Sequence, residues 1–118
     1  MGGERPARLY PNESVKRIIA FIPRGHLHTR LVIELEDQTI ILQEATVAAI
    51  VRAYASVAMH PTRRAVELAS RRLEERKPFY AEWQLVETGR REEEVLSEAE
   101  ELLEKASRPG TAAGEEAS

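Results

Sequence analysis

The sequence predicts an α+β domain: a small antiparallel sheet (β-β-β-α-α-β) with helices on one face, plus a C-terminal acidic helix. Two patterns predict this class. Apolar residues alternate with period two around residues 30 and 84, as they do on strands. From residue 44 they recur every three or four residues, as on a helix. With 118 residues and 42% hydrophobic content, the chain has room for one domain with a modest core.

The chain divides into four expected segments. Residues 1–13, with their Gly and Pro residues, predict a flexible and slightly basic arm. Residues 14–88 predict the single α+β domain, and 89–106 predict the acidic C-terminal helix. Residues 107–118 are small and polar, so we expect a disordered tail.

Three strands open the domain. Residues 15–22 are apolar and largely β-branched, and they end at a Pro-Arg-Gly turn. Residues 28–36 alternate, and 39–43 return as a third strand after the turn at Asp37-Gln38. We expect Glu36 opposite Thr39. The core face should carry Leu31, Ile33, Leu35, Ile40 and Leu42.

Two helices should follow. The first begins at Glu44 and ends before His60-Pro61. Between Val47 and Met59 its only charge is Arg52, so its surroundings should bury it nearly all round, in its own domain or against a second chain. Thr62 should cap the second helix, residues 63–76, whose charges stand at four-residue spacing.

A fourth strand and a last helix complete the prediction. Residues 79–87 alternate again, with Phe79 and Trp83 on the expected core side. Packing is therefore the expected role of Trp83, although an exposed aromatic could also stack on bases. Three glutamates open the last helix and Lys105 stands near its end, as the helix dipole favours.

One face of the predicted sheet lacks a cover. Apolar residues point there as well as toward the core, so we expect a further helix, a protein partner or a second copy of the chain to cover it. The residues on this second face are Ile19, Phe21, Val32 and Ile41.

The charge is split along the chain. Residues 1–90 carry 14 Lys and Arg against 11 Asp and Glu, whereas residues 91–118 carry 3 against 9. A mildly basic body of net charge +3 thus precedes a tail of net charge −6. This asymmetry suggests that the body meets an anion such as the DNA or RNA phosphate backbone and that the tail screens it.

Three basic stretches are candidate phosphate contacts: the arm and first strand, the loop at 23–30, and Arg63-Arg64 at an expected helix N-terminus. The alternative is solvated charge and intrahelical ion pairs. The candidate nucleic-acid-binding residues are Arg5, Arg8, Lys16, Arg17, Arg24, His26, His28, Arg30, Arg63 and Arg64.

No catalytic or cofactor motif is present, so we expect no enzyme, no catalytic residue and no cofactor. The absence of cysteine excludes disulfides and thiolate-held metals and fits a cytoplasmic location. His26, His28 and His60 have no reason to converge, so no metal site is expected. No signal or membrane-spanning segment is expected.

Several short phrases within residues 15–88 resemble a small protein type of thermophilic Crenarchaeota. They are Ile22-Pro23-Arg24-Gly25, Gln43-Glu44-Ala45-Thr46-Val47, Arg52-Ala53-Tyr54 and the run from His60 to Val66. Proteins of this type include non-catalytic accessory subunits of a B-family DNA polymerase. The resemblance implies a similar role and brings no functional residue with it.

Two functions are therefore expected. The first is a non-enzymatic nucleic-acid-associated protein, such as an accessory subunit of a DNA replication or transcription assembly. The alternative is a protein–protein interaction module or homodimer with no nucleic-acid contact.

Overall fold

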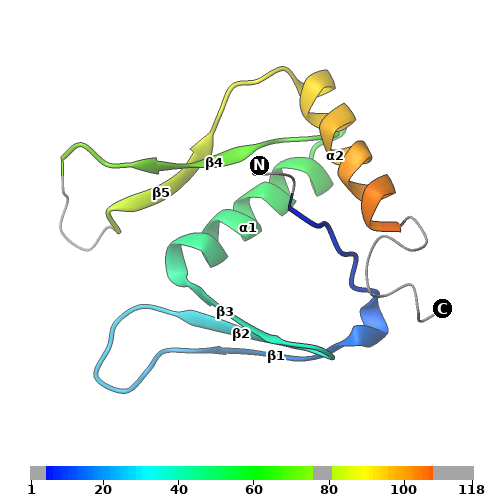
Figure 1. The fold of residues 1–118 in the computed structure, drawn as a ribbon. Helices are drawn as coiled ribbons and strands as arrows, with labels where there is room; N and C mark the ends of the chain where they lie inside the picture. The colour runs from blue at the N-terminus through cyan, green and yellow to red at the C-terminus, as the bar shows by residue number, and fades with distance from the viewer. Residues whose placement is uncertain (1–4, 76–80, 108–118) are drawn as a thin grey trace.

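The computed structural model describes residues 5–75 and 81–107 (Figure 1). The α+β class is confirmed, with the order β-β-β-α-β-β-α instead of the predicted β-β-β-α-α-β and final helix. The elements are a 3-10 turn Asn12–Ser14, β1 Val15–Phe21, β2 Arg30–Leu35, β3 Thr39–Gln43, α1 Glu44–Ala58, β4 Leu68–Arg72, β5 Trp83–Glu87 and α2 Glu92–Ser107. Arg76, Phe79 and Tyr80 lie outside the described residues, as do positions 1–4 and 108–118.

The elements form three layers. The antiparallel sheet β1-β2-β3 lies on one side of α1, and the β4-β5 hairpin lies on the other (Figure 1). Helix α2 follows the hairpin and stands at the edge of the molecule (Figure 1). The chain thus has one helix between two separate small sheets, instead of helices on one face of a single sheet.

The pairing of β2 with β3 differs from the prediction by two residues. Glu34, not Glu36, lies opposite Thr39, and the Leu35 N–H donates to the Gln38 carbonyl at 2.8 Å to close the turn. A shift of two residues leaves every side chain on its own face, because strand side chains alternate with period two. On β3, Ile40 and Leu42 are accordingly half-buried while Ile41 between them is exposed.

The predicted helix at 63–76 is wrong, and so is its Thr62 cap. Residues 68–72 form β4, which pairs antiparallel with β5 from Leu68 opposite Glu87 to Arg72 opposite Trp83. Strand β5 has no strand partner other than β4 in its sheet. The backbone N–H and C=O groups of β5 need hydrogen-bond partners, and β4 supplies them. This pairing outweighs the helix-forming tendency of the Arg, Glu and Ala residues. The Thr62 N–H instead donates to His60 Nδ1 at 3.2 Å.

Helix α1 has a clear physical start and end. Glu44 opens it with an acidic side chain beside the positive end of the helix dipole. Six of its residues are alanine, and these small side chains let a sheet and a hairpin approach it from two sides. At the far end the Met59 N–H donates to the Ala55 carbonyl at 3.1 Å, and Pro61 prevents any continuation.

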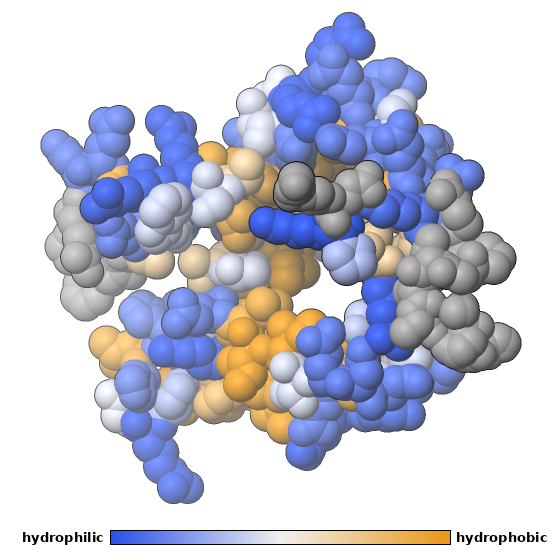
Figure 2. All heavy atoms as spheres, viewed as in Figure 1, coloured by the Kyte–Doolittle hydropathy of each residue, from blue (hydrophilic) through white to orange (hydrophobic). Residues whose placement is uncertain are grey.

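Very little of this fold is deeply buried. Among the described residues, Ala49 of α1 is the one buried apolar side chain, at 2% exposure, and Ser14 is the one buried polar residue. Thirteen large apolar side chains are exposed within residues 5–75 and 81–107. In Figure 2 apolar residues gather over the three-stranded sheet and in the centre of the molecule, where the surface is hollowed between hydrophilic lobes. The contacts within one chain therefore leave much apolar surface in water.

Candidate interaction surface

The clearest unpartnered surface is the outer face of α1. Ile50, Val51 and Tyr54 are 50%, 61% and 71% exposed. With Ala58, they lie within about 100° of one another around the helix axis, and Ala49 points to the opposite side. The sheet and the hairpin therefore cover α1 but leave this outer face open. Of the two covers expected for the helix, its own domain does not bury it nearly all round, and a second chain stays a prediction.

This outer face carries no charge from Val47 to Met59. The one charged residue in that stretch, Arg52, points elsewhere, because its guanidinium donates to the Leu85 carbonyl of β5 at 2.8 Å. Met59, at the C-terminal end of the helix, is also exposed, at 78%, but lies on another side of the helix. Helices at the surface of soluble proteins usually carry polar side chains on their outer side, so this uncharged outer face is a candidate interaction surface.

The second face of the three-stranded sheet is arranged as predicted. Ile19, Val32 and Ile41 lie side by side across the three strands, and Phe21 follows two residues after Ile19. Ile41 is 63% exposed and Phe21 39%, whereas Ile19 and Val32 are half-buried. The strand β1 also exposes Ile18, on the opposite face of the sheet, because α1 contacts β2 and β3 more closely.

A groove of about 790 Å³ lies where β2 ends, α1 begins and β5 passes. Trp83 lines it and is 56% exposed, contrary to the expected core position. Two candidate basic residues, His28 and Arg30, line the same groove with the amide side chains of Gln43 and Gln84. The groove thus combines an aromatic surface, the guanidinium of Arg30, an imidazole and amide hydrogen-bonding groups.

Glu44 connects the start of α1 to the segment just before β2 at this groove. Its carboxylate lies 2.6 Å from His28 Nδ1 and accepts the backbone N–H of Thr29 at 3.3 Å. These hydrogen bonds hold the pKa of Glu44 below its ordinary value, and the hydrogen bond with His28 has the largest effect. The first residue of α1 therefore fixes the segment that leads into β2.

Four of the ten candidate basic residues make ion pairs. Arg17 binds both oxygens of Glu34 at 2.9 and 3.0 Å, which raises the pKa of the guanidinium and lowers that of the carboxyl. The other pairs join Arg8 with Asp37, His28 with Glu44 and Arg63 with Glu87. Arg8 also stacks on the Tyr10 ring, 4.8 Å from its centroid.

The remaining six are spread over the molecule. Arg24 and His26 lie in the exposed turn after β1, where Gly25 has a φ of 81° that suits the third position of the turn. Arg30 donates to the His28 carbonyl, and Lys16 donates to that of Glu13. The exposed residues Arg5 and Arg64 lie on other segments. The fold brings only His28 and Arg30 into one groove and does not gather all ten residues into a single patch.

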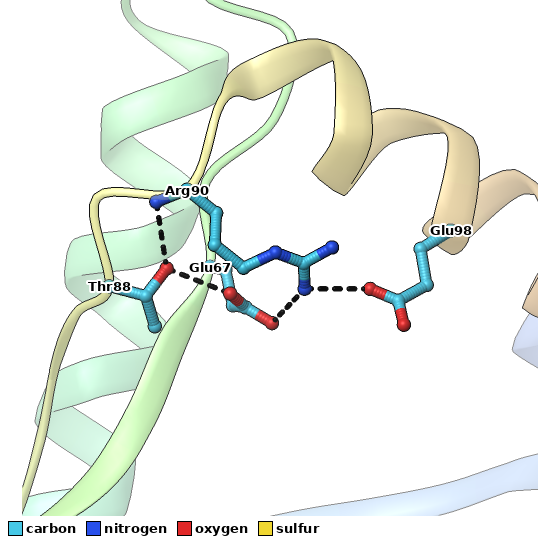
Figure 3. Close-up of polar contacts among 4 residues, drawn as sticks. All are labelled: Glu67, Thr88, Arg90 and Glu98. Atoms are coloured by element: carbon cyan, nitrogen blue, oxygen red, sulfur yellow. Dashed lines mark hydrogen bonds and ion pairs between the residues drawn. The ribbon is translucent and has the colours of Figure 1, made fainter.

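A polar network joins α2 to the hairpin (Figure 3). The guanidinium of Arg90 donates to Glu67 at 3.0 Å and to Glu98 of α2 at 2.8 Å, and these contacts raise its pKa. Thr88 donates its hydroxyl to Glu67 at 2.7 Å and accepts the Arg90 N–H at 3.2 Å. Since α2 has no buried residue, polar contacts attach it near its start: this network, and the backbone N–H of Arg64, which donates to the Glu92 carboxylate at 2.7 Å.

The described residues contain no group of three or more His, Asp or Glu side chains placed to hold a metal ion. In the same part of the chain no helix has the length and apolar character needed to cross a bilayer.

Two residues of interest were missed or misplaced by sequence reasoning. Tyr54 stands at helical spacing with Ile50 and Val51, which is equally typical of a buried and an open face. Trp83 was assigned to the core because it alternates with Phe79. The one signal in the sequence that pointed to an exposed Tyr54 is the near absence of charge on its helix, which led to the expectation that a second chain could cover that helix.

No protein-family model matches this chain, and no curated protein or solved structure matches it either.

The Glu44 contact predicts a pH dependence of stability. A carboxyl whose pKa is lowered by folding stabilises the fold above its ordinary value of 4.5, and loses that effect as the pH falls through the lowered value. Glu44→Gln should therefore lower the melting temperature at pH 7 and lose its effect near pH 3. Thermal unfolding monitored by circular dichroism measures both. Glu100→Gln on α2 is the control, and an equal deficit at both pH values would contradict the assignment.

The network of Figure 3 predicts that Arg90 holds α2 in place. Arg90→Gln should accelerate amide hydrogen exchange throughout α2 and leave exchange in the β1-β2-β3 sheet unchanged. Arg91→Gln is a matched control, because the Arg91 ion pair lies with Glu94 of α2 itself, at 4.0 Å. Equal exchange in the two variants would show that the network does not position α2.

Proposed function

We propose that this protein is a non-enzymatic interaction module, a subunit that functions in a protein assembly through the outer face of α1. The exposure of Ile50, Val51 and Tyr54 on a face without charge carries this proposal. The alternative role of an isolated monomer would leave these side chains in water permanently.

The energetic reason is direct. Complete burial of a Val, Ile or Met side chain is worth about 1.5–3 kcal/mol. The α1 face presents several such groups at half exposure or more, while a single alanine is buried in the described part of the chain. Covering this face therefore adds several kcal/mol, comparable with the about 5–15 kcal/mol by which whole domains are stable.

A photo-crosslinking experiment tests the proposal. A benzophenone side chain placed at position 54 and activated in the native cells should join the chain covalently to a protein. The same probe at Leu103, which is 55% exposed on α2, is the matched control. Adducts from position 54 and few from position 103 are expected. Absence of protein adducts from position 54 would contradict an assembly role for this face.

The groove favours a second candidate function, association with nucleic acid as an accessory subunit of a replication or transcription assembly. Exposed aromatic side chains beside cations bind single strands by stacking on bases while the cations meet phosphates. Trp83, Arg30 and His28 offer this combination. Glu44 and Glu82 also line the groove, so the phosphate path would have to avoid their carboxylates.

A titration tests this second candidate. Single-stranded DNA should bind with an affinity that falls steeply between low and moderate salt. Trp83→Ala should weaken binding about 10-fold, since stacking is worth about 1–3 kcal/mol per base. A chain ending at Arg90 should bind more tightly, because residues 91–118 carry a net charge of −6. Equal affinity of the native protein and Trp83→Ala would exclude the groove as the binding site.

A further inference from the structure

We infer that the partner on the outer face of α1 is a second copy of this chain, with the two α1 helices packed antiparallel about a two-fold axis. This inference rests on the proposed function. A two-fold interface uses one patch on both subunits, so the patch has to be complementary to itself. The sequence of α1 provides this complementarity.

Large and small side chains alternate suitably along the face. An antiparallel pairing centred between Arg52 and Ala53 sets Val51 against Tyr54 of the second copy. It also sets Val47 against Ala58 of that copy, while Ile50 and Ala55, about 140° apart around the axis, lie on opposite edges of the contact. At the centre of the contact larger side chains then meet smaller ones, as close packing between helices requires.

The charge distribution permits two copies to meet here. The chain carries a net charge of −3, and most of its excess acid lies on α2 and after it. The α1 face from Val47 to Met59 brings no charged side chain to the contact, because Arg52 is directed toward Leu85 of β5. Like-charge repulsion, which normally opposes self-association of a patch, is therefore absent from the centre of this one.

The size of the face sets the expected affinity. The helix is about 22 Å long, so each copy contributes only a few hundred Å² of apolar surface, on the order of half the about 800 Å² of a standard interface. A contact of this size belongs to the weak and reversible class. The dimer should therefore form in the micromolar range and depend on protein concentration.

Sedimentation equilibrium of the full chain is the first test. The mass should rise from 13.3 kDa toward twice that value between about 1 and about 200 µM protein. Tyr54→Glu should weaken association about 100-fold or more, since it opposes two like charges in an apolar contact. Leu103→Glu on α2 is the matched control and should dimerise normally. Circular dichroism establishes that each variant is folded.

Cross-linking tests the register without weakening the contact by charge. The chain has no cysteine, so single cysteines report cleanly. A mixture of Val51→Cys and Tyr54→Cys should oxidise to a mixed disulfide faster than either variant alone, because the two positions face each other. Ser97→Cys on α2 should remain unlinked. A dimer that forms no mixed disulfide would overturn the antiparallel α1 contact.

The monomeric outcome separates this inference from the proposed function. A native chain that stays monomeric at about 200 µM overturns the second copy as partner. If that monomer binds an apolar dye, and Tyr54→Glu abolishes the binding, the face is open and another protein remains its proposed partner. A monomer that binds no dye at this face would reject both the dimer and the assembly role.

Discussion

The position of α1 between two small sheets is the constraint on which the rest of the structure depends. The three-stranded sheet and the β4-β5 hairpin do not pair with each other, so α1 is the element that both contact. Ala49 is its deeply buried point, and alanines on either side let the two sheets approach. Helix α1 therefore has an apolar face that packs inside the protein around Ala49 and a second apolar face, with Ile50, Val51 and Tyr54, that is exposed to water. The same sequence property, few charges over fifteen residues, thus produces both the fold and the open surface.

Local pattern was sufficient for the elements whose partners are near in sequence. The alternation of residues 28–43 predicted β2, β3 and their common core face, and an error of two residues in pairing changed no side chain's face. The helical spacing after Glu44 predicted α1. The helix prediction for residues 63–76 is wrong because their Ala, Arg and Glu content suits a helix. The actual partner of this segment, β5, lies more than ten residues later in the chain. The charges of residues 63–76, expected to pair at four-residue spacing along a helix, instead form ion pairs with later residues: Arg63 with Glu87 and Glu67 with Arg90.

The surfaces were less predictable than the strands. Sequence reasoning identified basic residues by type, but which ones meet depends on pairing across the chain. Arg17 and Arg8 are joined to acids of the β2-β3 region, whereas His28 and Arg30 share a groove with Trp83. The exposure of Trp83 and Tyr54 could not be read from periodicity, because periodicity identifies faces and not their neighbours. The expectation that the second sheet face is apolar is met, since Ile41 and Phe21 there are 63% and 39% exposed.

The acidic helix α2 extends from the turn at Gly89, so the orientation of the whole helix depends on the backbone angles of that turn. The Gly89 φ of 80° is a conformation that glycine adopts without strain, and it directs the chain from β5 into α2. Helix α2 is about 24 Å long, so a rotation of about 10° at this turn moves its far end by about 4 Å. At that far end, the Lys105 ammonium donates to the Arg5 carbonyl at 3.4 Å. A rotation at Gly89 would therefore displace the glutamates of α2 together with the N-terminal segment that Lys105 contacts.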